Sequence, residues 1–325
     1  MSKILVTGGL GLIGHNVVSR LEKLGHTVYV TDTQTNYGII PQDEINYLMA
    51  ERKKKIKTHY IYKFDICDRR NMEWLFASKF DMVIHMASFP RQKVVNANPI
   101  WGSQVMSEGL INLLELSKKY SVKKFVYISS SMVYGDFTDD VKEDYNCKPQ
   151  GQYGILKLTG EHLLKDYTRR GCFDHVIIRP SAVYGPLDVE DRVIAKFMLT
   201  AMRDGVLKVN GAGETLDFTY VEDAADGIVA ASLSENTNNK TYNITKSHSR
   251  SLLDAAELAV KIVGKGSIEV REKDIDFPSR GALNIDAAKR DFGYDPKVDV
   301  EEGFESYYRW LSDSPFWTEK TIQIS

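Results

Sequence analysis

A glycine-spaced stretch near the start of the chain, Val6–Gly14, constrains the fold more than any other part of the sequence. It follows directly on the apolar run Ile4–Val6, which is typical of a short strand in a parallel sheet covered on both faces. A stretch with apolar residues at helical spacing begins straight after it. This order of strand, glycine turn and helix predicts the first unit of an α/β fold.

The spacing of the glycines indicates what the turn holds. Gly8 permits a tight turn, Gly11 lets backbone amides approach a pyrophosphate, and Gly14 lets the helix pack closely on the strand. A second predicted strand, Thr27–Thr31, is followed by Asp32, about 20 residues beyond the glycines. In dinucleotide-binding folds an acid at this position hydrogen-bonds the ribose. No Lys or Arg follows Asp32 closely, and its carboxylate would repel a 2′-phosphate. The sequence therefore predicts NAD rather than NADP.

Composition excludes several classes of partner. The 325 residues are 43% hydrophobic, which is enough for two lobes. A net charge of −2 argues against nucleic acid or an anionic membrane as a partner, and the one basic run, Arg52–Lys55, is expected to be a solvated helix end. Three scattered cysteines indicate a reducing compartment and no metal site. Without an early leader or an apolar run of about 18 residues, the expected location is the cytoplasm.

Strand and helix patterns alternate through the first half, which predicts a doubly wound parallel Rossmann sheet. Further strands are expected at Thr58–Phe64, Asp81–His85, Lys124–Ile128, His175–Ile178 and Asp217–Tyr220, and helices at 43–55, 99–120, 152–170 and 221–232. Beyond residue 180 the alternation becomes irregular. We therefore expect a nucleotide-binding lobe of residues 1–180, to which 215–243 return. A smaller substrate-binding lobe comprises 181–214 and 244–325, with a loose tail at 318–325.

A tyrosine and a lysine four residues apart form the candidate catalytic pair. Tyr153 and Lys157 share one face of a predicted helix. A phenol has a pKa of about 10, and a nearby ammonium would lower it toward the working range of a base. Ser130 lies in a serine triplet at the end of the preceding strand, where it would polarise a hydroxyl or carbonyl. A nicotinamide would carry the hydride.

Taken together, these motifs resemble the extended short-chain dehydrogenase/reductase family, and more narrowly its nucleotide-sugar epimerase/dehydratase branch. The motifs that carry the resemblance are Thr7–Gly14, Asp32, Asp65-Ile66, His85–Ala87, Ser129–Gly135, Tyr153 with Lys157, Arg179–Pro186 and Asp217–Asp223. The resemblance covers the chain from Lys3 to about Trp310. It implies a homodimer formed through the two long helices, whose leucine stripes are equally consistent with packing on the sheet.

The resemblance also implies roles for individual residues. It places the cofactor against Gly8, Gly11, Leu12, Ile13, Asp32, Asp65, Ile66, Met86, Ala87, Ser88, Ser129 and Pro180. Tyr153 would be the base, Lys157 its partner and the ribose anchor, and Ser130 the third catalytic member.

Two positions after Ser130 narrow the reaction. Dehydratases of the branch carry an Asp-Glu pair there, because loss of water needs an acid and a base. This chain has Ser131 and Met132. The remaining chemistry needs only hydride transfer and one proton, which predicts a 4-epimerase that oxidises and re-reduces a sugar with tightly bound NAD.

Three further departures concern the substrate. Ala182 and Leu216 stand where the branch has an asparagine and an arginine that hold the diphosphate, and Met106 stands at another expected asparagine. Arg280 sits where the family places a second diphosphate arginine. Arg91 and Arg192 are spare cations that would compensate, since a guanidinium suits phosphate. Ser131 and Ala182 are also expected to border the substrate.

The sequence leaves alternatives open. The missing diphosphate ligands favour a net dehydrogenase or reductase acting on a sugar, and a 4,6-dehydratase is a further enzyme alternative. An NAD-binding regulatory protein without activity is the reading from a different class, because fold alone does not establish function.

Overall fold

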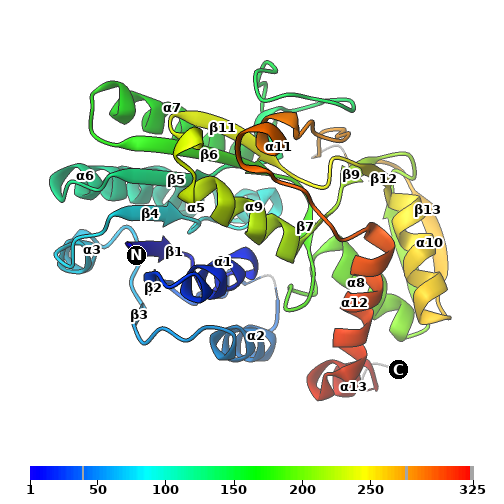
Figure 1. The fold of residues 1–325 in the computed structure, drawn as a ribbon. Helices are drawn as coiled ribbons and strands as arrows, with labels where there is room; N and C mark the ends of the chain where they lie inside the picture. Colours follow the sequence, from blue (N-terminus) through cyan, green and yellow to red (C-terminus); the bar gives the residue numbers. More distant parts are fainter. Residues whose placement is uncertain (39, 275–276, 323–325) are drawn as a thin grey trace.

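The computed structural model describes residues 1–38, 40–274 and 277–322, and a seven-stranded parallel sheet forms its centre (Figure 1). The strand order is β11-β6-β5-β4-β1-β2-β3, and each neighbouring pair is parallel. The strands are β1 (Lys3–Thr7), β2 (Thr27–Thr31), β3 (Ile61–Tyr62), β4 (Met82–His85), β5 (Lys124–Ile128), β6 (Asp174–Pro180) and β11 (Lys240–Ile244). The chain winds outward from β1 in both directions, so the predicted doubly wound sheet is confirmed. A ligand crevice is expected beyond the carboxyl ends of β1 and β4.

The two faces of the sheet bury separate clusters of side chains, because successive strand residues point to opposite faces. In β1, Ile4 and Val6 belong to one cluster and Leu5 to the other, and all three are fully buried. The first face is covered by α1 (Leu12–Lys23), α9 (Val221–Leu233) and α11 (Asp286–Phe292). The second is covered by α3 (Arg69–Phe76), α6 (Leu110–Lys119) and α7 (Gly151–Arg169). Burial on both faces explains why these strands are continuous apolar runs.

A smaller lobe lies beside the sheet and has its own core (Figure 1). Its elements are α8 (Val193–Met202), β8 (Val206–Asn210), α10 (Leu252–Val263), β13 (Ser267–Arg271), α12 (Val300–Asp313) and α13 (Pro315–Ile322). None of the helices in the described part of the chain combines the length and apolar character that a membrane span requires.

Several boundaries differ from the sequence predictions. The strand expected at Asp217–Tyr220 is divided into β9 (Thr215–Asp217) and β10 (Thr219–Tyr220), which pair with β12 (Ser249–Ser251) and β7 (Val183–Tyr184) outside the central sheet. The strand that returns to the sheet is β11, beside β6. Strand β3 is shorter than the predicted Thr58–Phe64. The side chains of Ile285, Ala288 and Tyr294 pack in the first lobe's core, although the sequence division placed 244–325 in the smaller lobe.

The helix predicted over residues 99–120 is interrupted by a wider turn. It consists of α5 (Pro99–Ser103), a π-helical turn over Gln104–Gly109, and α6. Gly109 at the end of this turn packs so closely on Ile66 that a Cβ atom would lie 2.7 Å from the isoleucine side chain. The leucines of α6 face the sheet, so the stripe seen in the sequence belongs to the core.

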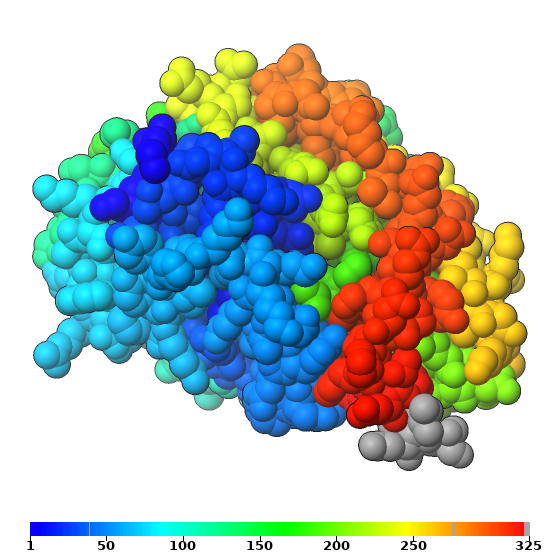
Figure 2. All heavy atoms as spheres, turned by 60° about the horizontal axis from the view of Figure 1, so that its bottom comes forward, coloured from blue at the N-terminus to red at the C-terminus, as the bar shows by residue number. Residues whose placement is uncertain are grey.

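Two segments far apart in sequence meet at one edge of the molecule (Figure 2). The segment after β2 forms α2 (Gln42–Lys54), and the tail that the sequence predicted to be loose forms α13 as far as residue 322, while 323–325 lie outside the described residues. The rings of Tyr47 and Phe316 stack with centroids 4.3 Å apart, and the Tyr47 hydroxyl lies 2.8 Å from Ser314 Oγ. Apolar and polar contacts with α2 thus hold the tail in a helix.

Candidate active site

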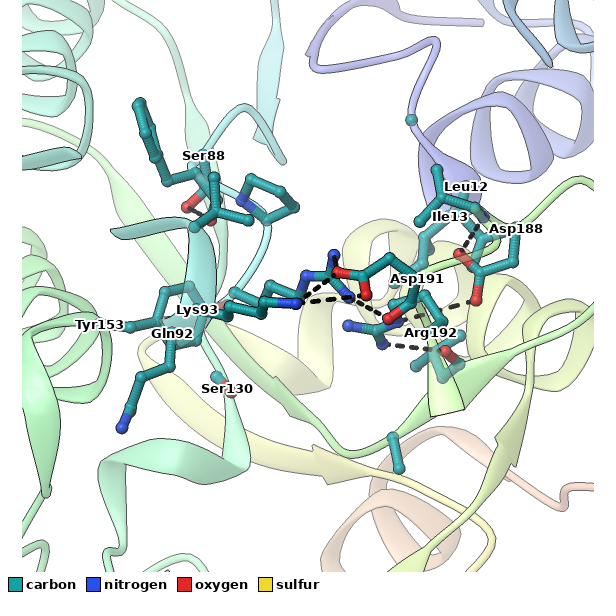
Figure 3. Close-up of a pocket in the computed structure, with 18 of the residues that line it drawn as sticks. Leu12, Ile13, Ser88, Gln92, Lys93, Ser130, Tyr153, Asp188, Asp191 and Arg192 are labelled. Atoms are coloured by element: carbon teal, nitrogen blue, oxygen red, sulfur yellow. Dashed lines mark hydrogen bonds and ion pairs between the residues drawn. The ribbon is translucent and has the colours of Figure 1, made fainter. Parts of the chain in front are cut away.

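A cavity of about 820 Å³ lies where the sheet meets the smaller lobe. Every residue that the sequence analysis assigned to cofactor, catalysis or substrate lines it. Figure 3 shows Ser130 and Tyr153 on one wall, Leu12 and Ile13 on the opposite wall, and the pair Lys93 and Asp191 between them. The volume is at the upper end of the ~300–1,000 Å³ common for ligand pockets.

The glycine turn forms the cofactor end of the cavity. Gly8 has a φ of +69°, and a Cβ atom there would lie 2.7 Å from the backbone nitrogen of Ala87. At Gly14 a Cβ would lie 2.2 Å from the carbonyl oxygen of Gly8. Helix α1 begins after Gly11, which provides no side-chain cap, so the first amides of the helix face the cavity end without a side-chain acceptor. His15 is buried in this first turn, and its Nδ1 lies 2.9 Å from the Gly11 carbonyl oxygen.

Asp32 lies at the end of β2, directly beside the turn. Its Oδ2 accepts a hydrogen bond from the amide of Leu10 at 3.0 Å, and its Oδ1 accepts one from Gln34 at 2.8 Å. Burial raises the pKa of Asp32, and these hydrogen bonds and the nearby Arg52 charge oppose that change. The carboxylate is therefore oriented and partly compensated before any ligand contact.

Arg52 is not the solvated end of a basic run, as the sequence predicted. Only 4% of its surface is exposed, and its side chain lines the cavity. Its Nη1 donates to the carbonyl of Leu10 at 3.0 Å, and its Nε and Nη2 donate to the carbonyl of Leu187 at 3.2 and 2.7 Å. The apolar residues Ile45 and Leu48 turn this face of α2 inward. The helical spacing of Ile45, Leu48 and Arg52 puts the three on one face, and this pattern could have predicted from the sequence that Arg52 is buried.

The opposite part of the cofactor end is lined by Asp65, Ile66 and an aromatic group. The ring of Tyr37 lies 4.6 Å from that of Phe89 and 5.5 Å from that of Trp101, measured between centroids. These three rings line the cavity, and they join the segment after β2 to the loop after β4 and to α5. Sequence reasoning named none of the three.

The loop after β4 carries Met86, Ala87 and Ser88 along the cavity. A buried hydrogen bond of 2.7 Å between Thr7 Oγ1 and His85 Nδ1 joins β1 to β4, and the amide of Ala87 donates to Thr7 Oγ1 at 3.2 Å. Burial lowers the pKa of His85 to about 3. His85 therefore joins β1 to β4 as a neutral side chain.

Tyr153, Lys157 and Ser130 lie together in the lining of the cavity. Ser130 caps the turn after β5 by accepting a hydrogen bond from the Met132 amide at 3.2 Å, and it also hydrogen-bonds Tyr153. Lys157 Nζ donates to the carbonyl of Ile128 at 2.7 Å and lies 5.8 Å from the centroid of the Tyr153 ring. Both α7 residues are thus fixed against the end of β5.

Burial has the largest effect on the pKa values of Tyr153 and Lys157. Burial raises the pKa of Tyr153, while the hydrogen bond with Ser130 and the charge of Arg192 lower it. Burial lowers the pKa of Lys157 to about 7, against the opposing charge of Glu161. The Lys157 ammonium donates to the Ile128 carbonyl and is itself largely desolvated, and its effect on the pKa of Tyr153 stays a prediction.

A buried ion pair supports the catalytic end from behind. Arg179 Nη2 lies 2.6 Å from Glu161 Oε2, with 3% and 0% of the side chains exposed. Ser129 donates to Glu161 at 2.6 Å, and Arg179 also donates to the Tyr134 hydroxyl at 2.9 Å. Ser129, predicted as a cofactor contact, therefore lines the cavity while its hydroxyl serves this network.

The cations expected to hold the substrate are engaged with acids that the sequence analysis did not name. Arg91 donates to the Asp191 carbonyl at 2.7 Å and pairs with its carboxylate, which Lys196 also contacts at 2.6 Å. Arg192 Nε lies 3.7 Å from Asp188 Oδ2 and its Nη2 donates to the Val183 carbonyl at 3.3 Å. These acids belong to the segment 187–192, which we call the 187–192 loop.

Arg280 differs from these cations. Among the described residues its guanidinium has no hydrogen-bond or ion-pair partner, and its Nε is buried. Burial, together with the like charge of Arg192, lowers its pKa to about 10.

Ala182, at the position of the missing asparagine, has a φ of +35°, a backbone conformation that asparagine tolerates better than alanine. Ser131 is buried and donates to Ser181 Oγ at 3.2 Å.

The residues present fit a dinucleotide. The turn leaves a cradle that a Cβ atom at Gly8 or Gly14 would fill. The helix N-terminus suits a pyrophosphate, and the Asp32 carboxylate stands at the ribose position. No group of three His, Cys, Asp or Glu side chains that could hold a metal occurs within residues 1–38, 40–274 and 277–322.

Comparisons with known proteins agree with this geometry. The sequence profile described as the NAD dependent epimerase/dehydratase family matches residues 4–245. The chain is 27% identical over 330 residues to an uncharacterized UDP-glucose epimerase of Bacillus subtilis (strain 168), with 95% of this chain and 98% of that protein covered. It is 26% identical over 326 residues to dTDP-D-glucose 4,6-dehydratase of Bos taurus, with 96% and 89% covered. The crystal structure of UDP-glucuronic acid 4-epimerase from Bacillus cereus, in complex with UDP-glucuronic acid and NAD, has a TM-score of 0.87 and 28% identity, with 95% and 99% covered.

Proposed function

Because this chain belongs to the NAD-dependent epimerase/dehydratase family, we propose that it is a nucleotide-sugar 4-epimerase. The family is NAD-dependent, and its relatives are named for more than one reaction, since a UDP-glucose epimerase and a dTDP-D-glucose 4,6-dehydratase match this chain at 27% and 26% identity. The choice between reactions therefore rests on the chain's own residues.

In the proposed reaction, Tyr153 takes the proton of the sugar 4-hydroxyl while Ser130 holds the same oxygen. When bound, NAD would supply the hydride chemistry at C4. Lys157 lies one helical turn from Tyr153 and would donate a hydrogen bond to the cofactor's ribose. After the 4-keto sugar turns its other face, Tyr153 returns the proton, so the overall reaction is redox-neutral.

The observation that carries the proposal is the absence of an acid–base pair beyond Ser130. Ser131 and Met132 are 1% and 5% exposed, and neither side chain titrates near neutral pH. Among the described acids that line the cavity, Asp32 and Asp65 lie at the cofactor end, Asp188, Asp191 and Glu214 pair with cations, and Asp274 follows β13 in the smaller lobe. Loss of water would require an acid and a base at the sugar, and the turn after β5 supplies neither.

Arg280 is the proposed ligand of the substrate diphosphate. Its guanidinium is unpartnered among the described residues and lines the cavity in the smaller lobe, and a guanidinium fork suits phosphate oxygens. Arg91 and Arg192 would assist only after release from Asp191 and Asp188. UDP-glucuronic acid occupies the similar enzyme of Bacillus cereus, so a uridine nucleotide is the first to test.

A net dehydrogenase acting on a sugar without a diphosphate is the second candidate. The observation that favours it is the loss of two family diphosphate ligands, at Ala182 and Leu216, both of which line the cavity. This reaction would consume or form NADH in proportion to substrate.

We further propose that the protein is a homodimer. Ile100, Ile111 and Ile155 are 77%, 41% and 50% exposed on α5, α6 and α7, the helices that would pair across such a dimer. Light scattering at micromolar concentration should give twice the chain mass of 36.8 kDa. A monomer mass would refute this part.

The test of function is mass spectrometry, after chromatographic separation, of a nucleotide-sugar panel incubated with the purified protein. A new peak of unchanged mass, absent with Tyr153→Phe, would support epimerisation and identify the nucleotide. A product lighter by one water would mean dehydration and refute the reading of Ser131 and Met132. No product, together with NADH formed from a simple sugar, would favour the second candidate. The Tyr153→Phe variant should retain NAD, because the phenol oxygen is not part of the pyrophosphate turn.

A further inference from the structure

Among the described residues of α2, Ile45, Met49 and Arg52 line the cavity, and Arg52 is the charged one of the three. The other basic residues of the run stay at the surface, as Lys54 shows with 69% of its side chain exposed. Within this run only Arg52 is buried. Three of its five N–H groups donate hydrogen bonds to two backbone carbonyls from different parts of the fold. A buried guanidinium requires such partners to offset its desolvation.

The first of these carbonyls belongs to the pyrophosphate turn. Leu10 lies between Gly9 and Gly11 and is fully buried. Its amide is held by Asp32 at 3.0 Å and its carbonyl by Arg52 at 3.0 Å. Both polar groups of this peptide residue are therefore fixed by side chains of opposite charge. Arg52 and Asp32 thus hold the turn together with the backbone hydrogen bonds of Gly8 to Thr31 and of Gly11 to Gly8.

The second carbonyl begins the 187–192 loop. Leu187 has a φ of +70°, a left-handed conformation that a leucine rarely adopts and that persists only where surrounding contacts enforce it. The two hydrogen bonds from Arg52 to its carbonyl are such contacts. The next residues, Asp188, Asp191 and Arg192, line the cavity, and Figure 3 shows them on the side of Leu12 and Ile13, across from Tyr153.

A second contact from α2 holds the same loop. The carboxylate of Glu44 is fully buried and accepts a hydrogen bond from the Glu190 amide at 2.7 Å. Lys320 of α13 lies 3.1 Å from both Glu44 and Glu190. Helix α2 therefore contacts the 187–192 loop at two points, through Glu44 and Arg52. Of these two side chains, Arg52 also donates a hydrogen bond to the glycine turn.

From these contacts we propose that Arg52 is a positioning residue that couples the cofactor turn to the 187–192 loop, so that NAD binding orders the wall that meets the substrate. The claim about substrate rests on the proposed function, whereas the coupling itself does not. A lysine would not replace this arrangement, because one ammonium lacks the planar fork that bridges two carbonyls.

Hydrogen exchange measured by mass spectrometry tests the coupling without any activity. Peptides that cover residues 187–192 are compared in the full chain, with NAD removed and with NAD added. In the wild type, NAD should slow exchange of this loop. Arg52→Met should bind NAD more weakly and, at saturating NAD, should show no slowing in the loop. Lys54→Met removes a neighbouring charge from the exposed face and should match the wild type. Equal slowing in Arg52→Met and wild type would overturn the proposal.

Arg52→Lys covers the case in which the methionine variant does not fold. It keeps the charge and most of the volume, so it should fold and yet show a reduced effect of NAD on the loop. An undiminished effect in Arg52→Lys would also overturn the proposal.

Kinetics then test the substrate side. At saturating NAD, Arg52→Met should raise the KM for the nucleotide sugar roughly tenfold, the scale of one lost charge-assisted hydrogen bond, with a smaller change in kcat. A purely structural defect would lower the active fraction and leave KM unchanged, which would contradict the positioning role. If the wild type epimerises nothing in the panel, the proposed function fails, while the exchange experiment still decides the coupling.

Discussion

Replacing Lys157 by methionine should make the NAD-free protein more stable at neutral pH while removing its activity. The lysine is 4% exposed, and burial lowers its pKa from 10.5 to about 7. An unfolded chain leaves the ammonium in water, so folding at pH 7 forces a protonated group into a site that disfavours it. Methionine has a similar length and brings no charge.

The size of the effect follows from the two pKa values. Each pKa unit corresponds to about 1.4 kcal/mol, so the difference between 10.5 and about 7 amounts to about 5 kcal/mol of destabilisation at low pH. The variant leaves the Ile128 carbonyl without its donor, which costs about 1–3 kcal/mol. Lys157→Met should therefore raise the free energy of unfolding by about 2–4 kcal/mol at pH 7.

The sign of the pH dependence is specific to this lysine. Below the folded-state pKa of about 7 both states carry the proton and the full penalty is present. Between pH 7 and 10.5 the unfolded state binds more protons, so wild-type stability rises relative to the variant by about 1.4 kcal/mol per pH unit. The advantage of the variant should shrink across this range.

Urea unfolding of both proteins, stripped of NAD, at pH 7, 8 and 9 measures this difference directly. Lys54→Met is the matched control, because its side chain is exposed and its removal should not alter the slope of stability against pH. Equal stability at pH 7 and parallel pH curves for wild type and Lys157→Met would refute the argument that the site holds this lysine at a cost.

Three further changes probe other parts of the site. Glu161→Gln should lower the free energy of unfolding by about 3–5 kcal/mol, because it leaves Arg179 buried without its charge partner; a loss below about 1 kcal/mol in urea unfolding would contradict this. Gly14→Ala should abolish NAD binding by calorimetry, since its Cβ would lie 2.2 Å from a backbone oxygen, whereas Gly213→Ala, with no atom within 4 Å, should bind normally. Arg280→Met should raise the KM for the nucleotide sugar about 10-fold or more with little change in kcat, and an unchanged KM would place the diphosphate elsewhere.

The sequence was sufficient to predict the features that depend on local residue patterns. The glycine turn, Asp32 and the apolar strands obey local rules, so the parallel sheet and the cofactor end could be predicted from them. The Tyr153 and Lys157 pair was predictable for the same reason, because helical spacing alone places both on one face.

The features that could not be predicted depend on contacts between distant segments. Arg52 looked like part of a surface charge run, and only the packing of α2 against the glycine turn shows that it is buried. Asp191 is adjacent to Arg192 in sequence, but its pairing with Arg91 requires the two lobes to meet. The orientation of the Lys157 ammonium is likewise a matter of three-dimensional surroundings, since it depends on the carbonyl of Ile128.

The π-helical turn between α5 and α6 has an evolutionary consequence. A π turn holds one residue more than an α turn, so it is equivalent to a single-residue insertion that a long helix has absorbed without breaking. Because of this extra residue, the side chains of α5 point in a different direction around the helix axis than they would if α5 continued α6 without interruption. Val105 in this turn lines the cavity, while Gly109 at its end packs on Ile66, a predicted cofactor contact. A residue change in α5 can therefore alter the lining of the cavity while the contact between Gly109 and Ile66 is kept.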